Sequence, residues 1–125
     1  MSFDSWHDAH EVSLALVDDG WMSPNSYSNH WDEPGNFSAV YLFQVHDRET
    51  LRKSLVAYVG QSIYIKMRLS GHEVLRALNH PDVWVKRWFK RTSRERLDET
   101  ELRYIQQFDP PWNIQGKRRG VSFGG

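Results

Sequence analysis

The stretch Ser38-Ala39-Val40-Tyr41-Leu42-Phe43-Gln44-Val45-His46 decides the fold of this chain. Six of its nine residues are apolar and four of these are β-branched or aromatic, which is typical of a buried strand. After a charged connector over 47–54, Leu55-Val56-Ala57-Tyr58-Val59-Gly60 has the same character. Two such strands joined by a short connector most simply form an antiparallel hairpin. This pairing places Tyr41 and Tyr58 near matching ends of adjacent strands.

The rest of the chain predicts helices and one further strand around this hairpin. The alternation of apolar and basic residues over 83–91 predicts a third strand. Helices are expected over 4–17, 62–74 and 94–108, with Ser93 as the N-cap of the last and Asp109-Pro110-Pro111 as its stop. The expected fold class is therefore α+β, a small three-stranded antiparallel sheet flanked by helices, with an N-terminal extension of helix and loop.

Length and composition favour one domain with two appendages. The 125 residues are 39% hydrophobic and include six Trp, six Phe and five Tyr, enough for one modest core. We expect an acidic N-terminal extension over 1–37, a core over 38–116 and a basic, Gly-rich tail over 117–125. Neither a membrane-spanning run nor a secretory signal is recognisable, and the absence of Cys suits a reducing cytoplasm.

The formal net charge of zero hides a strong asymmetry along the chain. Residues 1–38 contain seven acids and no Lys or Arg, whereas residues 39–125 hold all 16 Lys and Arg against nine acids, a formal +7. This pattern indicates a polyanionic partner for the basic part, or simply a solvated basic face. The acidic extension either packs against the core or restrains access of nucleic acid to it.

Several polar residues follow one another in an order that indicates a function. Tyr41 is followed by Tyr58-Val59-Gly60, then by Arg68 and His72, which share a face if they lie on one helix. Glu101-Leu102-Arg103-Tyr104-Ile105 comes next, then Pro110 and Asn113. Together these residues resemble the GIY-YIG nuclease superfamily, over about two thirds of the chain. The resemblance implies the same α+β core and a metal-dependent endonuclease that hydrolyses DNA phosphodiester bonds.

The resemblance also implies a role for each of these residues. Glu101 would be the ligand of one divalent metal, Mg²⁺ or Mn²⁺, which keeps several waters and needs only one or two carboxylates. Tyr41, helped by His72, would orient or deprotonate the attacking water, and Tyr58 and Arg68 would stabilise the phosphate. Asn113 would hydrogen-bond either the backbone of the site or the substrate. Gly60 would permit a tight turn or a close approach of backbone to phosphate.

The chain departs from the family pattern at three places. Ala39 stands where the family usually has Gly, and the connector between the first two strands is longer than usual. Gln61 stands where some relatives carry a Lys. These differences concern the branch of the family more than the fold.

Basic side chains on the third strand and beside it are candidates for binding the DNA backbone. In a strand, Lys86, Trp88 and Lys90 share one face, and Arg87, Phe89 and Arg91 share the other. The expected DNA-binding residues are Lys66, Lys86, Lys90 and Arg91. Two alternatives remain open: a non-catalytic module that binds nucleic acid or protein on the same fold, and a nuclease that needs a targeting partner or a second copy of itself.

Overall fold

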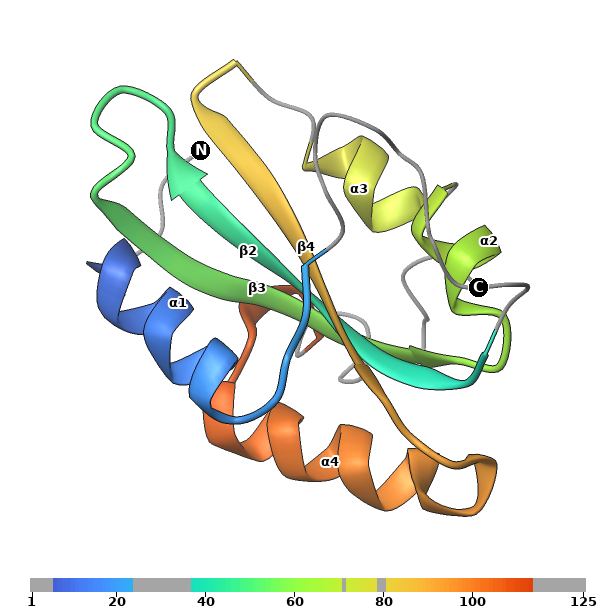
Figure 1. The fold of residues 1–125 in the computed structure, drawn as a ribbon. Helices are drawn as coiled ribbons and strands as arrows, with labels where there is room; N and C mark the ends of the chain where they lie inside the picture. The colour runs from blue at the N-terminus through green and yellow to red at the C-terminus, as the bar shows by residue number, and fades with distance from the viewer. Residues whose placement is uncertain (1–5, 24–36, 71, 79–80, 114–125) are drawn as a thin grey trace.

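The chain forms a four-stranded antiparallel sheet between two layers of helices (Figure 1). This computed structural model describes residues 6–23, 37–70, 72–78 and 81–113. The strands are β1 (His7–Asp8), β2 (Ala39–Asp47), β3 (Lys53–Ser62) and β4 (Val83–Arg91), in the order β1-β3-β2-β4. The helices are α1 (Ala9–Asp18), α2 (Ile65–Ser70), α3 (Glu73–Ala77), the short 3₁₀ helix η1 (Arg94–Arg96) and α4 (Leu97–Phe108).

The predicted α+β class and the three long antiparallel strands are confirmed. The prediction of only three strands was wrong, because β1 pairs with the outer edge of β3 through His7↔Ser54 and Asp8↔Lys53. β1 consists of two exposed polar residues, which are too few to show the alternation that predicts a strand. β1 exists because β3 offers unpaired backbone groups at its edge.

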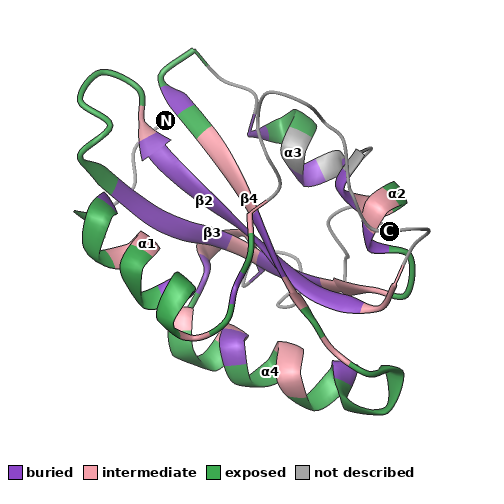
Figure 2. Cartoon of the chain, in the orientation of Figure 1, coloured by how far each residue is buried: buried purple, intermediate pink, exposed green. Residues whose placement is uncertain are grey.

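The core has two halves, one on each face of the sheet. The first contains Tyr41, Phe43 and Val45 of β2 with buried residues of α2 and α3. The second contains Val40 and Leu42 of β2 with buried residues of α1 and α4. Figure 1 shows α1 and α4 on one side of the sheet and α2 and α3 on the other. Because both faces are covered, β2 is buried along almost its whole length (Figure 2).

The described part of the N-terminal extension is packed into this core. Asp8 accepts a hydrogen bond from the Glu11 amide (3.0 Å) and caps α1, which starts later than the helix expected from residue 4. A buried amide then joins α1 to the sheet, since Gln44 bonds both Ser13 of α1 and Ser54 of β3. Residues 6–23 therefore belong to the fold, as the packing alternative predicted.

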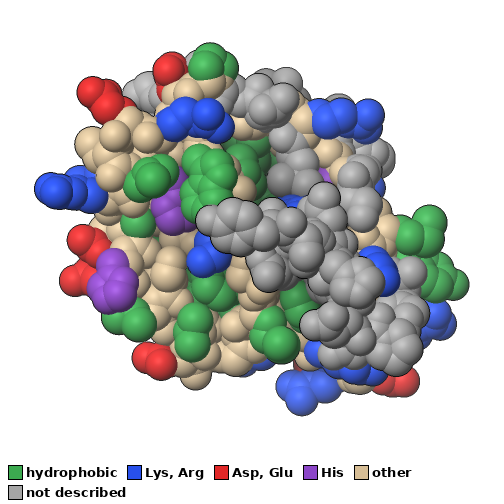
Figure 3. Space-filling view, turned by 45° about the horizontal axis from the view of Figure 1, so that its top comes forward, with side chains coloured by type: hydrophobic (Ala, Val, Ile, Leu, Met, Phe, Trp, Pro, Cys, Tyr) green, Lys and Arg blue, Asp and Glu red, His purple; other side chains and the backbone are tan. Residues whose placement is uncertain are grey.

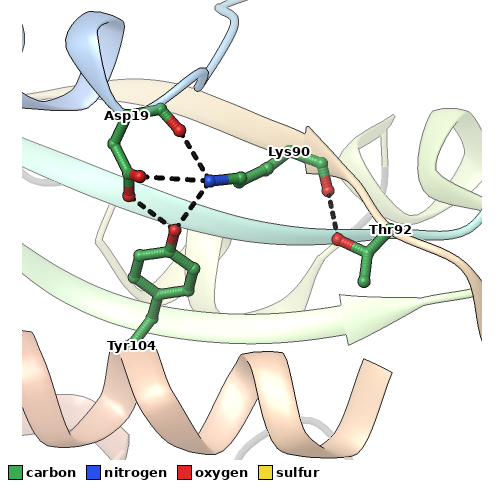
Figure 4. A network of polar contacts seen from close by, with 4 residues as sticks. All are labelled: Asp19, Lys90, Thr92 and Tyr104. Atoms are coloured by element: carbon green, nitrogen blue, oxygen red, sulfur yellow. Dashed lines mark hydrogen bonds and ion pairs between the residues drawn. The ribbon is translucent and has the colours of Figure 1, made fainter. Parts of the chain in front are cut away.

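The end of α1 is fixed by a network shared with β4 and α4 (Figure 4). Lys90 Nζ donates to the backbone oxygen of Asp19 (2.6 Å), to its carboxylate (3.2 Å) and to the Tyr104 hydroxyl (2.8 Å). The Tyr104 hydroxyl donates to the other carboxylate oxygen of Asp19 (2.5 Å). Burial acts to raise the pKa of Asp19, but the hydrogen bonds from Tyr104 and Lys90 outweigh it and hold that pKa below its usual value.

The helical boundaries correct two further predictions. The helix expected over 62–74 is two short helices, because α2 ends at Ser70 and His72 has an extended backbone (φ −100°, ψ 134°) as the N-cap of α3. The helix expected from Arg94 begins as η1 and becomes α-helical at Leu97. It stops where predicted, at Asp109, which has a left-handed backbone (φ 47°). No helix in the described part of the chain is long and apolar enough to cross a membrane.

Candidate functional site

A β-bulge in β3 brings the two tyrosines to the same face of the sheet. Tyr41 pairs with Gly60 and Phe43 with Tyr58, but Gln44 then pairs with Val56, so Ala57 is the extra residue. Without this insertion, strict alternation would put Tyr58 on the face opposite Leu55. Bulges often re-aim a side chain beside a functional site. Here the bulge directs Tyr58 toward Phe43, with the rings stacked at 5.8 Å between centroids.

The ring of Tyr41 lies directly over Gly60. A Cβ atom at Gly60 would stand 2.5 Å from both Cζ and the hydroxyl oxygen of Tyr41. Gly60 lies inside β3 and is buried, so the predicted tight turn is not there. The glycine is needed because the Tyr41 ring occupies the space that a side chain would fill.

The Tyr41 hydroxyl is held by a buried histidine. Its oxygen lies 2.6 Å from His72 Nε2, and both side chains are almost fully buried. The other ring nitrogen, Nδ1, accepts the Val74 amide hydrogen at 3.0 Å. Since Nδ1 is used as an acceptor, the proton of the neutral imidazole is on Nε2. His72 therefore donates to the Tyr41 oxygen, a bond that favours the phenolate over the phenol.

Arg68 and Tyr58 complete the surroundings of this hydroxyl. Burial raises the pKa of Tyr41 strongly and the nearby Tyr58 hydroxyl adds to the rise, whereas a hydrogen bond and the charge of Arg68 oppose it. The raised pKa favours the neutral phenol, and of the two roles expected for Tyr41 the orientation of water fits this better than its deprotonation. The rings of Tyr41 and Tyr58 lie 6.2 Å apart, and the His72 ring is edge-on to both.

Arg68 and His72 reach Tyr41 from two different elements. We expected them on one helix face, but Arg68 belongs to α2, while His72 precedes α3 with an extended backbone. Ile65, one turn before Arg68, and Leu69, the residue after it, are buried in the core on this face of the sheet and fix the orientation of α2. Arg68 and His72 therefore both lie beside the Tyr41 hydroxyl, although they do not share a helix face.

Asn113 binds the backbone of β3 between Tyr58 and Gly60. Its Oδ1 accepts the Val59 amide hydrogen (2.7 Å) and its Nδ2 donates to the Val59 carbonyl oxygen (2.7 Å). The side-chain amide therefore takes the place of a neighbouring strand at this edge of β3. The sequence left two partners open for Asn113, the backbone of the site and the substrate. In the structure its partner is the backbone of β3.

Replacing Asn113 by Ala is expected to destabilise the fold. Val59 is fully buried, so its amide and carbonyl would lose their partners away from water. We expect the free energy of unfolding to fall by about 2–4 kcal/mol. Chemical denaturation monitored by tryptophan fluorescence measures it, with Gln106→Ala, an exposed amide on α4, as the control. A loss below about 0.5 kcal/mol for Asn113→Ala would show that the two bonds are not needed.

Glu101 lies on the layer of α4, across the sheet from Arg68 and His72. It is half-buried and shares a stripe of the helix with the buried Leu97 and Tyr104. One turn earlier, the Asp98 carboxylate accepts a hydrogen bond from Gln61 at the end of β3 (2.8 Å). The first turns of α4 thus run beside the same end of β3 that carries Tyr58 and Gly60.

Within the described part of the chain, only an ion that needs few protein ligands would fit. Among the described residues, no three His, Asp or Glu side chains gather to hold a metal ion. A single carboxylate at a core-facing helical position, as at Glu101, fits Mg²⁺, which takes one or two carboxylates and completes its shell with water and phosphate. It does not fit a structural zinc site, which needs four protein ligands.

Arg87 is a neighbour of the site that the sequence did not single out. It pairs with Phe43 across β2 and β4, and its Nη1 donates to the Leu69 carbonyl oxygen at 3.0 Å. Burial lowers the pKa of this half-buried guanidinium. Arg87 therefore ties the last turn of α2, and with it Arg68, to the sheet. The alternation of residues 83–91 predicted that Arg87 and Phe89 share this face, but not the hydrogen bond of Arg87 to α2.

The basic side chains of β4 alternate as predicted, but they have partners within the protein. Lys86 lies over the Trp88 ring (4.6 Å) and Arg91 over the Phe37 ring (4.7 Å), on opposite faces. Lys90 is committed to Asp19 and Tyr104. Lys66 is half-buried on α2. On the face drawn in Figure 3, the described Lys and Arg side chains lie among hydrophobic and acidic ones and form no continuous track.

Comparison with known proteins adds no relative to this description. No protein-family model, no curated protein and no solved structure matches the chain.

Proposed function

We propose that this protein is a divalent-metal-dependent DNA endonuclease with a GIY-YIG-like core. The observation that supports the proposal most is the group formed by Tyr41, Tyr58, Arg68 and His72. Tyr58 of β3, Arg68 of α2 and His72 before α3 surround the phenolic oxygen of Tyr41, which lies beside a β-bulge and against Gly60. β-Bulges are common next to active sites, where they re-aim a side chain.

The geometry suggests how these side chains share the work. His72 donates to the Tyr41 oxygen and keeps it in place, and Arg68 supplies a positive charge beside the two phenols. A phosphate group at Arg68 would be bound through charge-assisted hydrogen bonds. Tyr58, which is partly exposed, would hold a phosphate oxygen or the attacking water. Tyr41 would orient rather than deprotonate that water, since its pKa is raised.

Glu101 would hold the metal, with Mg²⁺ or Mn²⁺ as the expected ion. The bound ion would act as a Lewis acid on the phosphate and neutralise charge at the leaving oxygen. Because Glu101 comes from the α4 layer and Arg68 from the opposite one, their shared substrate would have to lie at the edge of β3. Asn113 fixes the backbone at that edge.

Plasmid cleavage tests the proposal. We expect the wild-type protein to convert supercoiled plasmid into nicked or linear DNA with Mg²⁺ or Mn²⁺, and to stop when the metal is chelated. Glu101→Gln keeps the size of the side chain and removes its charge, so we expect cleavage to fall by at least about 100-fold. Glu99→Gln, an exposed carboxylate on the same helix, is the matched control.

The other outcomes separate the alternatives. Salt-sensitive DNA binding by a folded protein that never cleaves would favour a non-catalytic binding module. If wild type and Glu101→Gln cleave equally well, Glu101 is not part of the active site. Activity that appears only with an added protein would indicate a subunit that needs its partner.

A further inference from the structure

Three large apolar side chains stand exposed beside the site, where β3 passes into α2. Ile63, Tyr64 and Met67 have exposed fractions of 40%, 53% and 68%. Figure 3 shows hydrophobic side chains protruding at its right-hand edge, the side on which α2 lies in Figure 1. A soluble domain seldom places three such side chains together unless they contact something.

The geometry of α2 joins this patch to Arg68. The Arg68 amide donates to the Tyr64 carbonyl oxygen at 3.0 Å, so the helical hydrogen-bonding pattern begins at Tyr64. Residues three and four apart on a helix have Cβ atoms about 5–6 Å from each other. Tyr64 is therefore a direct neighbour of both Met67 and Arg68, whereas Ile63 precedes the helix. Arg68 in turn hydrogen-bonds the Tyr41 hydroxyl.

The segment that carries the patch is positively charged, which suits a nucleotide. Residues 61–70 contain Lys66 and Arg68 and no Asp or Glu. A phosphate held at Arg68 carries its own sugar and base, which must lie close by because they are covalently attached. Tyr64 and Met67, which precede Arg68 on the same helical turn, offer that base an exposed aromatic and apolar surface.

We propose that Tyr64, supported by Met67, stacks on an unpaired nucleobase next to the phosphate that the site binds. This inference rests on the proposed function and names its substrate class. A base inside an intact duplex is already stacked on its neighbours and cannot also cover Tyr64. The preferred DNA therefore has an unpaired or displaced base near the cut, as in a bubble, a flap or a single strand.

A binding measurement that does not require cleavage tests the inference. A DNA bubble with 2-aminopurine in its unpaired segment is titrated with wild-type protein in the presence of a chelator, and the fluorescence of the base reports its stacking. We expect the bubble to bind more tightly than the matching duplex and its fluorescence to be quenched. Tyr64→Ala should weaken binding to the bubble by at least about fivefold. Tyr64→Phe, which keeps the ring, should restore it.

Leu14→Ala is the matched control, because Leu14 is similarly exposed (49%) but lies on α1. Equal affinity of wild type and Tyr64→Ala for the bubble would overturn the inference, even if cleavage that depends on Glu101 is found. Quenching without any metal-dependent cleavage would leave the stacking in place and overturn the proposed function. Absence of DNA binding would overturn both.

A second copy of the chain could cover the patch instead of a base. Sedimentation of wild type and Met67→Ala tests for such a dimer. A dimer that becomes a monomer on this substitution would make the patch a protein interface and overturn the inference. A monomer in both cases is the result we expect.

Discussion

Replacement of Tyr41 by Phe is expected to lower DNA cleavage by at least about 100-fold while the fold persists. The substitution removes only the oxygen on which His72 and Arg68 converge. The ring would remain over Gly60 and edge-on to His72. Because the buried Nε2–H of His72 loses its acceptor, we also expect unfolding to become easier by about 1–3 kcal/mol.

Tyr104→Phe is a close control for this experiment. Tyr104 is also fully buried, and its hydroxyl also makes two hydrogen bonds, to Asp19 and from Lys90. It lies on the other face of the sheet, in the half of the core formed with α1. We expect a similar loss of stability but cleavage within about threefold of wild type. Equal losses of cleavage for the two variants would show that Tyr41 acts only through the stability of the fold.

Gly60→Ala is expected to destabilise the protein by about 3 kcal/mol, at the upper end for an overpacked core. The new methyl group would meet the Tyr41 ring at 2.5 Å, far closer than carbon atoms can approach. The ring cannot move aside cheaply, because its hydroxyl is bonded to His72 and its neighbours are buried. Urea denaturation of wild type and variant measures the difference.

A double-mutant cycle separates this clash from the general cost of placing Ala in the strand. In a Tyr41→Leu background the distal ring atoms are absent, so adding Gly60→Ala should cost less than about 1 kcal/mol. The coupling between the two positions should therefore be about 2 kcal/mol or more. If Gly60→Ala costs the same in both backgrounds, the ring is not the reason that this position is a glycine.

The fold was largely predictable because its long elements carry clear patterns. β2, β3 and β4 are runs of apolar, β-branched and aromatic residues, and strict alternation placed Trp88 and Phe89 on opposite faces of the sheet as predicted. Asp109 before two prolines ended α4 where expected. In each case a local property of the sequence determines the local structure.

The features that shape the candidate site depend on tertiary pairing and could not be predicted in this way. The bulge at Ala57 is a mismatch between the registers of two strands, and neither strand reveals it alone. β1 forms only because β3 has a free edge. The separation of α2 from α3 lets His72 cap one helix and donate to a tyrosine of the sheet. Spacing alone suggested a shared helix face instead.

Asn113 and Glu101 illustrate the same limit at the level of single side chains. Their sequence context singled out both residues, but only the structure shows that Asn113 substitutes for a strand at Val59. It likewise shows that Glu101 approaches from the opposite layer to Arg68. A substrate that contacts both Glu101 and Arg68 would therefore have to lie at the edge of β3.

Plasmid cleavage is the first measurement to make on the proposed metal-dependent nuclease. Supercoiled plasmid is incubated with purified wild type, Tyr41→Phe and Glu101→Gln, each with Mg²⁺ and after chelation. We expect cleavage that requires the metal and is lost in both variants, while circular dichroism shows that both are folded. Metal-independent cleavage, or full activity in either folded variant, would contradict it.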